Sequence, residues 1–264
     1  MSVKYLTICM NFRDESEYLD EWLSYHLKVG VDHFILYDNN SDDNYLKILD
    51  NYIKKNVVTL LKFKGNRVKN YTYPNTIKEF KNFSRWIAFI DCDEFLVPEK
   101  KCLKEELSFF EEFAGVRVCT RFFGSNGHIS KPKGGVLRNF TKRAEDSFFK
   151  KNLVKVIVNP KLTQEKFCNP HHFDFLNGSK SVDTKKRDIV IKDKNSKYYC
   201  YDATFEKIYL NHYWCKSYEE YKVKHNKPND FTGEKMRRGD CKVMFDKYNE
   251  NTNSVEDFQI LRFL

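Results

Sequence analysis

The sequence predicts an α/β fold in which a mostly parallel central sheet carries helices on both faces. Through the first ninety or so residues, short apolar runs of strand length alternate with segments whose apolar residues recur at helical spacing. The strand-like runs are apolar throughout, as expected for strands covered on both faces. Polar clusters directly follow three of these runs, at the strand ends where ligands bind in such sheets. The chain has 264 residues, enough to bury a sizeable core.

The first half is the regular part of the pattern. Its helices are expected at 14–29, at 45–53 and, as a short segment, at 76–83. Asp14 and Glu17 have the spacing of a capping box, and Gly30 is suited to end the first helix. The strands are expected at 5–10, 34–37, 57–61 and 86–90. Four strands connected by three helices predict parallel pairing with helical crossovers.

The second half is less regular. Strands are expected at 116–121, 154–158 and 207–210, and a flexible loop at 123–128. Ser217 and Glu220 form a second capping-box pattern, which predicts a helix running toward Lys224. Because there is no internal repeat and no linker-like stretch, we expect residues 1–264 to form a single domain.

Composition limits the class of protein but does not select a partner. Lys and Arg total 46 against 37 Asp and Glu, a net charge of +9, which favours phosphates, nucleic acid or an acidic membrane surface. A solvated lysine-rich surface explains the same charge equally well. No apolar run approaches the roughly 18 residues of a membrane span, and the first residues do not resemble a signal peptide. The eight cysteines have no Cys-x-x-Cys spacing, which argues against a zinc ribbon and suits reduced thiols. We therefore expect a cytoplasmic protein without a transmembrane segment.

Two carboxylates, Asp91 and Asp93, come directly after the fourth predicted strand. Hard oxygen ligands of this kind suit Mg²⁺ or Mn²⁺, which can bridge to a substrate diphosphate. Acids are also common in turns, but the position at a strand end beside other polar clusters favours a metal site.

Two further residues have both a functional and a structural interpretation. Asp38 follows the second predicted strand, where its carboxylate either accepts hydrogen bonds from a nucleoside or only shapes an Asx-turn. His212 follows the last predicted strand, where its imidazole either completes the carboxylate site or packs between aromatic residues.

The chain resembles glycosyltransferase family 92 and its bacterial and viral relatives over residues 5–263. The resemblance depends on several long motifs in a fixed order, which are FRDE at 12–15, YDNNSDD at 37–43, WIAFIDCDEFL at 86–96, FGSNGH at 123–128 and NHYWCKSYEE at 211–220. It departs from the usual family pattern at Arg13 and Asp14, where Lys-Asn is common, and at Asn126, where Ser is common.

The resemblance implies a GT-A fold with a nucleotide-sugar-binding half at 1–98 and an acceptor-side half at 99–264. It implies an inverting, metal-dependent transfer of a sugar from a nucleotide donor, commonly a UDP-sugar, to a hydroxyl of a glycan. The roles that it implies are nucleoside contact for Asp38 with Arg13 and Glu15 close by, ribose and metal binding for Asp91 and Asp93, and contact with the metal–diphosphate unit for His212. The metal is expected to be Mn²⁺ or Mg²⁺.

An inverting enzyme needs one general base on the acceptor side. His128 and Asp174 are the candidates, because both lie in the half expected to bind the acceptor. Lys155 and Arg143 are candidate phosphate or acceptor contacts.

Two other classes remain as alternatives. One is a phosphatase with Asp91 as nucleophile and Asp93 as acid, although its motif normally follows the first strand. The other is a non-enzymatic carbohydrate- or nucleic-acid-binding protein, suggested by the positive charge and the aromatic content. No nucleic-acid partner is expected. Contact with a membrane surface, the sugar, the acceptor and the oligomeric state stay open.

Overall fold

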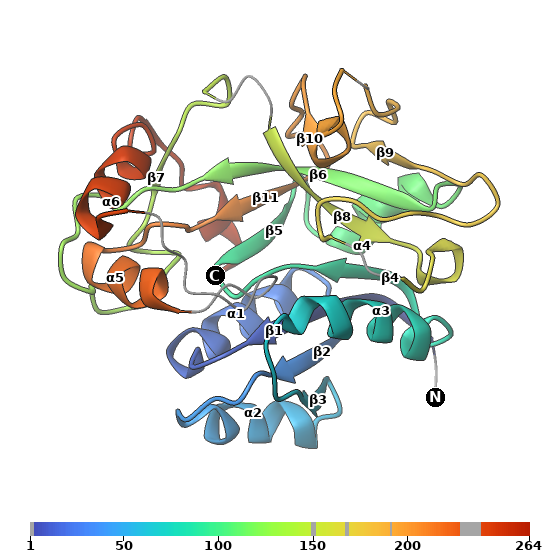
Figure 1. Cartoon of the computed structure of the whole chain (residues 1–264), viewed down its shortest axis with the longest axis horizontal. Coiled ribbons are helices and arrows are strands. Elements are labelled where there is room, and N and C mark those ends of the chain that lie inside the picture. The colour runs from blue at the N-terminus through green and yellow to red at the C-terminus, as the bar shows by residue number, and fades with distance from the viewer. Residues whose placement is uncertain (1–2, 149–151, 167–168, 191, 228–238) are drawn as a thin grey trace.

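The computed structural model describes residues 3–148, 152–166, 169–190, 192–227 and 239–264. A central sheet with the strand order β3-β2-β1-β4-β8-β6-β11-β5 crosses the molecule (Figure 1). Its first four strands in the chain all pair in parallel and are β1 (Lys4–Phe12), β2 (His33–Asp38), β3 (Val58–Lys62) and β4 (Ser84–Phe89). They are connected by α1 (Ser16–Lys28), α2 (Tyr45–Lys54) and α3 (Val68–Phe80). The predicted α/β class and the parallel pairing of the first four strands are confirmed.

The other half of the sheet is mixed. Its strands are β5 (Glu94–Pro98), β6 (Gly115–Phe122), β8 (Asn152–Val158) and β11 (Ile208–His212). β8 runs antiparallel to both β4 and β6, whereas β11 is parallel to β6 and antiparallel to β5. Short strands extend it, namely β9 (Ser181–Asp183) beside β6 and β10 (Tyr199–Cys200) beside β8. A separate small sheet pairs β7 (Lys142–Arg143) with β12 (Val255–Glu256).

The helices of this half are α4 (Leu103–Leu107), α5 (Tyr218–Asn226) and α6 (Cys241–Asn249). Figure 1 shows α5 and α6 together at one end of the sheet, on the left of the view. Short 3₁₀ turns lie at Ser108–Phe110, Pro160–Leu162, Ser196–Tyr198 and Gln259–Phe263. Within the described ranges no helix is long and apolar enough to cross a membrane. The cysteines of those ranges are free thiols, and Cys168 lies outside them.

The core lies on both faces of the parallel half, because successive strand residues point to opposite sides. Ile8 of β1 belongs to the apolar cluster that includes Trp22 of α1. The next residue, Cys9, belongs to a second cluster that includes Tyr73 of α3. Helices therefore cover both faces, as the continuous apolar strands predict.

The predicted capping box at the start of α1 is wrong. Asp14 has a left-handed φ of 54°, and its Oδ1 accepts a hydrogen bond from the backbone N–H of Asp42 at 2.8 Å. The N–H of Ser16 instead donates to the Asp43 carboxylate at 2.7 Å. Since β1 and β2 are parallel, the loops after them meet at one edge of the sheet, and one loop caps the helix of the other. The capping box of Ser217 in α5 is confirmed, with both reciprocal hydrogen bonds present.

Two further boundaries differ from the predictions. The short helix expected at 76–83 is α3, which begins at Val68 and contains Pro74. The buried residues of α3 include Lys69 and Thr72. Because a helix is recognised in a sequence by the spacing of its apolar residues, the part of a helix that buries polar residues is missed. β5 was not predicted from the sequence. Its five buried residues begin at Glu94, directly after Asp91 and Asp93, and so resemble a continuation of the acidic segment rather than a separate strand.

Candidate functional site

The candidate site forms where the carboxyl ends of the parallel strands meet the end of β11. Asp38 is the last residue of β2, and Asp91 lies two residues beyond β4. β5 then runs antiparallel to β11, with His212 directly opposite Glu94. This antiparallel pairing brings the acidic cluster after β4, which is Asp91, Asp93 and Glu94, beside a histidine more than one hundred residues later in the chain.

Asp91 is held by two lysines from different elements. Lys69 of α3 donates to its Oδ1 at 2.7 Å, and Lys155 of β8 donates to its Oδ2 at 3.2 Å. Both lysine side chains are almost completely buried. Burial by itself raises the pKa of Asp91, but the ammonium groups of these two lysines hold it well below its ordinary value. Lys155 also pairs with Glu94 at 2.9 Å, so its ammonium group contacts two carboxylates at once.

Asp93 has a different environment. Its Oδ2 lies 3.4 Å from His212 Nε2 and also accepts from the ammonium group of Lys224 of α5. The other ring nitrogen of His212, Nδ1, lies 3.6 Å from Glu94 Oε1. Burial raises the pKa of Asp93, and the charges of Lys224 and His212 more than reverse this and lower it well below its ordinary value.

The donor types of Asp93 and His212 suit a divalent ion, although the Asp93 oxygen that faces His212 also accepts from Lys224. A carboxylate oxygen and an imidazole nitrogen are both Mn²⁺ ligands, and their separation of 3.4 Å suits two donors of one coordination shell. Mg²⁺-type sites commonly take one or two carboxylates and complete their shell with water and substrate phosphates. Asp91 turns both oxygens to lysines instead, and in the described part of the chain no three His, Cys, Asp or Glu side chains converge on one point.

Asp38 uses both carboxylate oxygens within the protein. Oδ1 accepts from the backbone N–H of Ser41, three residues on, at 2.8 Å and so shapes the loop after β2, and Oδ2 accepts from the Tyr45 hydroxyl at 2.7 Å. The structural interpretation of Asp38 is thus present in the fold. Its nucleoside contact stays a prediction.

Arg13 and Glu15 lie at the start of α1, next to the end of α5. Lys227 of that segment donates to Glu15 at 2.7 Å and to the backbone carbonyl of Arg13 at 2.8 Å. The Arg13 guanidinium lies 3.7 Å from Asp14 and is substantially exposed. The loop after β1 and the segment after β11 are therefore joined directly.

Buried polar side-chain atoms without a hydrogen-bond partner among the described residues lie near the end of β1. Both side-chain polar atoms of Asn11 are enclosed and have no hydrogen-bond partner among the described residues, and the same holds for Asn70 Oδ1. Asn11 pairs in register with Tyr37, and it follows by two residues Cys9, which pairs with Phe89. Asn11 and Asp91 are thus level at the strand ends.

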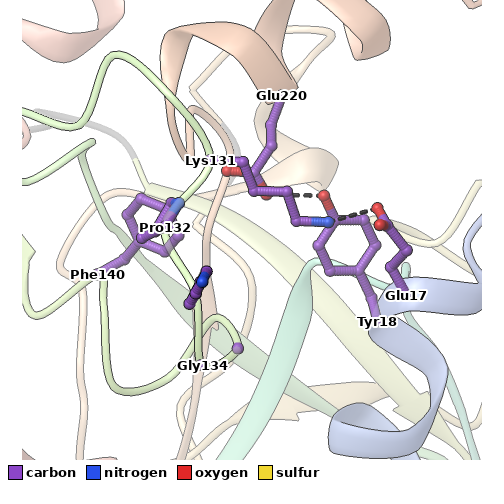
Figure 2. A pocket seen from close by; sticks show the side chains of 9 residues that line it. Glu17, Tyr18, Lys131, Pro132, Gly134, Phe140 and Glu220 are labelled. Atoms are coloured by element: carbon purple, nitrogen blue, oxygen red, sulfur yellow. Dashed lines mark hydrogen bonds and ion pairs between the residues drawn. The ribbon is translucent and has the colours of Figure 1, made fainter.

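A cavity of about 390 Å³ opens beside Tyr18 and Glu220 (Figure 2). The Tyr18 hydroxyl in its wall donates to Glu220 at 2.7 Å, and the Lys131 ammonium contacts Glu17. The ring of Tyr18 also contacts the Lys216 ammonium, which lies within electrostatic reach of Asp93. The cavity is lined by Glu17 and Tyr18 of α1, the segment 131–135, Phe140 and Glu220 of α5.

The candidate bases occupy different places. The ring of His128 meets Phe140, which lines the cavity, edge to face at 5.6 Å. Asp174 is paired with Lys166 at 2.9 Å and with His172 at 3.3 Å, and among the described residues it has no contact with the acids after β4. Of the two candidates, only His128 lies near the cavity, where it contacts the lining residue Phe140 without lining the cavity itself.

Arg143, expected as a phosphate or acceptor contact, is engaged elsewhere. Its Nε pairs with Asp257 at 2.6 Å and its guanidinium with Asp146 at 3.0 Å, beside the small β7–β12 sheet. Lys155, expected in the same role, lies inside the acidic cluster.

Sequence reasoning missed most of the cations. Lys69, Lys224 and Lys227 were not identified, because a lysine-rich chain gives no local signal for the few that become buried. Lys216 lies inside the NHYWCKSYEE motif but was not assigned a role there. Asn11 was not considered, because it lies between the strand expected at 5–10 and the motif at 12–15.

Comparisons with known proteins agree with this arrangement. The family model described as glycosyltransferase family 92 matches residues 4–261. A family 92 glycosyltransferase of Oryza sativa subsp. japonica is 28% identical over 183 residues, covering 67% of this chain and 31% of the relative. One from Ricinus communis is 26% identical over 211 residues, covering 77% of this chain and 37% of the relative. The chain thus spans about a third of the length of these relatives.

Solved structures of TarS from S. aureus are similar to part of the chain. A structure of residues 1–349 gives a TM-score of 0.41 at 17% identity, covering 60% of this chain and 48% of that one. Another, in complex with UDP, gives 0.38 at 18% identity, covering 49% of this chain and 38% of that one. Because the family model matches nearly the whole chain, from β1 to the last 3₁₀ turn, the protein belongs to glycosyltransferase family 92.

Proposed function

We propose that this chain transfers a sugar from a nucleotide diphosphate donor, a UDP-sugar by family resemblance, to a hydroxyl of a glycan with inversion at the sugar carbon. One observation carries the proposal. The two side-chain polar atoms of Asn11, buried without a hydrogen-bond partner among the described residues, lie level with Asp91 at the sheet edge where α/β proteins bind nucleotides.

The donor side combines three kinds of group. The carboxamide of Asn11 offers a donor and an acceptor, which suits a nucleobase edge or a ribose hydroxyl. Asp93 and His212 would hold a divalent ion, and such an ion supplies Lewis-acid neutralisation of the charge on the leaving diphosphate. The buried lysines of the cluster place further positive charge at the same edge, where it stabilises negative charge that develops as the sugar–phosphate bond breaks.

The acceptor side is the cavity beside Tyr18 and Glu220. His128 stands next to its wall through Phe140, so we propose His128 rather than Asp174 as the base. Its imidazole takes the proton of the acceptor hydroxyl while that oxygen bonds to the sugar carbon and the diphosphate leaves with the electron pair of the broken bond.

The test is a screen of nucleotide sugars against the purified chain, with and without Mn²⁺, by thermal shift and by release of the nucleoside diphosphate. A ligand that binds only the folded state raises the melting temperature by mass action. We expect a UDP-sugar with Mn²⁺ to give the largest shift. Release of inorganic phosphate from an aryl phosphate, with no response to any nucleotide sugar, would instead support the phosphatase alternative and overturn the proposal.

A further inference from the structure

Lys216 differs from the other lysines of the acidic cluster. It is 7% exposed, yet within the described residues no carboxylate oxygen lies within ion-pair distance of its ammonium group and no hydrogen bond reaches it. Its contact is with the ring of Tyr18, whose centroid lies 3.4 Å from Nζ. By contrast, Lys69 and Lys227 each contact a carboxylate at 2.7 Å.

The fold holds Lys216 in an unfavourable state. A buried ammonium group without a paired anion loses hydration that a ring face replaces only in part. Lys216 also has a left-handed φ of 47°, a conformation that residues other than glycine adopt uncommonly. Burial lowers the pKa of Lys216, although nearby carboxylates, Glu15 first among them, act in the opposite direction.

The surroundings of Lys216 indicate what it binds. His212 is the last residue of β11, and Lys216 lies four residues beyond it. The Lys216 ammonium group is within electrostatic reach of Asp93. In the donor proposed above, the anionic part is the diphosphate, and that is the part a metal on Asp93 and His212 would meet. The Tyr18 ring that Lys216 contacts also lines the acceptor cavity. The ammonium group therefore lies between the proposed donor site at Asp93 and the proposed acceptor cavity.

We propose that Lys216 is a donor-binding residue whose ammonium group pairs with the diphosphate of the nucleotide sugar. This inference rests on the proposed function, because it presupposes a nucleoside diphosphate donor. The bound diphosphate supplies the anion that the other lysines of the cluster already have in Asp91, Asp93 or Glu15.

The experiment measures Kd values of uridine, UMP and UDP in Mn²⁺ by titration calorimetry, for the wild type, Lys216→Met and Lys222→Met. Lys222 is the matched control, because it is an exposed lysine only six residues away on α5. For Lys216→Met we expect UDP affinity to fall by about tenfold or more, the scale of a lost charged hydrogen bond, with uridine affinity unchanged. Lys222→Met is expected to bind all three ligands as the wild type does.

The melting temperature without ligand separates this role from a structural one. Removing an unpaired buried charge is expected to leave it unchanged or raised. A lower melting temperature with equal losses for uridine and UDP would assign Lys216 to packing and overturn the inference, as would unchanged UDP affinity. Lys216→Gln repeats the measurement if the Met variant does not fold. A wild type that binds no nucleoside diphosphate would overturn the donor proposal itself, and this inference with it.

Discussion

His212 contacts two carboxylates through its two ring nitrogens, Asp93 at 3.4 Å and Glu94 at 3.6 Å. If it holds the ion together with Asp93, His212→Ala is expected to lose Mn²⁺-dependent UDP affinity and transfer activity together. The free energy of unfolding without ligand should change little, because the imidazole of His212 lies at the edge of the acidic cluster rather than within an apolar core. The measurement is UDP affinity with and without Mn²⁺, beside the melting temperature in metal-free buffer.

A packing role for His212 gives the opposite pair of results. Phe122 and Trp214 both lie against its ring, so a structural role is physically reasonable. In that case His212→Ala would lower stability by a few kcal/mol, as large-to-small core substitutions do. The folded fraction would keep its Mn²⁺-dependent affinity, and His212 would leave the site.

Asp38 shows why one residue can satisfy a structural and a functional pattern at once. Asp38→Ala removes the acceptor of both the Ser41 N–H and the Tyr45 hydroxyl, and we expect it to lower the free energy of unfolding by about 1–3 kcal/mol. Tyr45→Phe is the control, since it removes only the second hydrogen bond. Urea titrations measure the stability of both. UDP affinity that falls in Asp38→Ala but not in Tyr45→Phe would support the nucleoside contact, and equal affinity in both would leave the shaping of the loop after β2 as the whole role.

At the scale of elements, His26 ties α1 to β5. Its Nδ1 lies 2.8 Å from the carbonyl of Trp22, its Nε2 accepts from the N–H of Leu96 at 3.3 Å, and its ring stacks on Phe95. Both ring nitrogens are used by a neutral imidazole, so protonation would remove the acceptor that Leu96 needs. Burial lowers the pKa of His26 to about 3.

This depressed pKa predicts a stability loss in mild acid. An unfolded histidine titrates near pH 6.5, so below that value the unfolded state takes up a proton that the folded state refuses. The stabilisation that neutral His26 gives the folded state is complete above pH 6.5. It falls by about 1.4 kcal/mol for each pH unit as the pH drops toward 3. His26→Gln should remove one histidine's share of the slope of unfolding free energy between about pH 6.5 and 5, while His33 and His171, whose pKa values burial also lowers, keep their own share. Parallel curves for variant and wild type would contradict the assignment.

At the scale of the whole molecule, β8 joins the parallel half to the mixed half. Ile157 of β8 pairs with Ala88 of β4, is almost completely buried and belongs to the larger core cluster. Lys155 of the same strand holds Asp91 across this joint. The core is therefore continuous across the boundary between residues 98 and 99 that separates the expected donor and acceptor halves.

A continuous core predicts cooperative unfolding. Ile157→Ala is expected to lower the free energy of unfolding by about 2–5 kcal/mol, and the whole chain should lose structure in one transition. Far-ultraviolet circular dichroism and tryptophan fluorescence should report the same midpoint in urea, for the wild type and for the variant. Separate midpoints would show that the two halves unfold independently and that residues 1–264 are not one cooperative domain.

Local pattern was a good guide wherever one rule decides the outcome. The first four strands follow from continuous apolar runs, and the α5 capping box follows from two residues that satisfy each other within one turn. It failed where the partner comes from elsewhere in the chain. Asp14 matches a capping box, but it binds the next loop, because parallel strands bring both loops to one edge.

The sequence by itself determined the α/β class, the parallel pairing of the first four strands and the position of Asp91, Asp93 and His212 at element ends, because apolar periodicity and turn chemistry act over a few residues. Only the tertiary structure decided which groups these residues meet. The pairing of β11 with β5 brings His212 to Asp93, and the burial of Lys69 and Lys155 turns Asp91 toward ammonium groups instead. Such contacts depend on the register of strands far apart in the chain, and electrostatic pairing in a buried cluster leaves no periodic trace in the sequence.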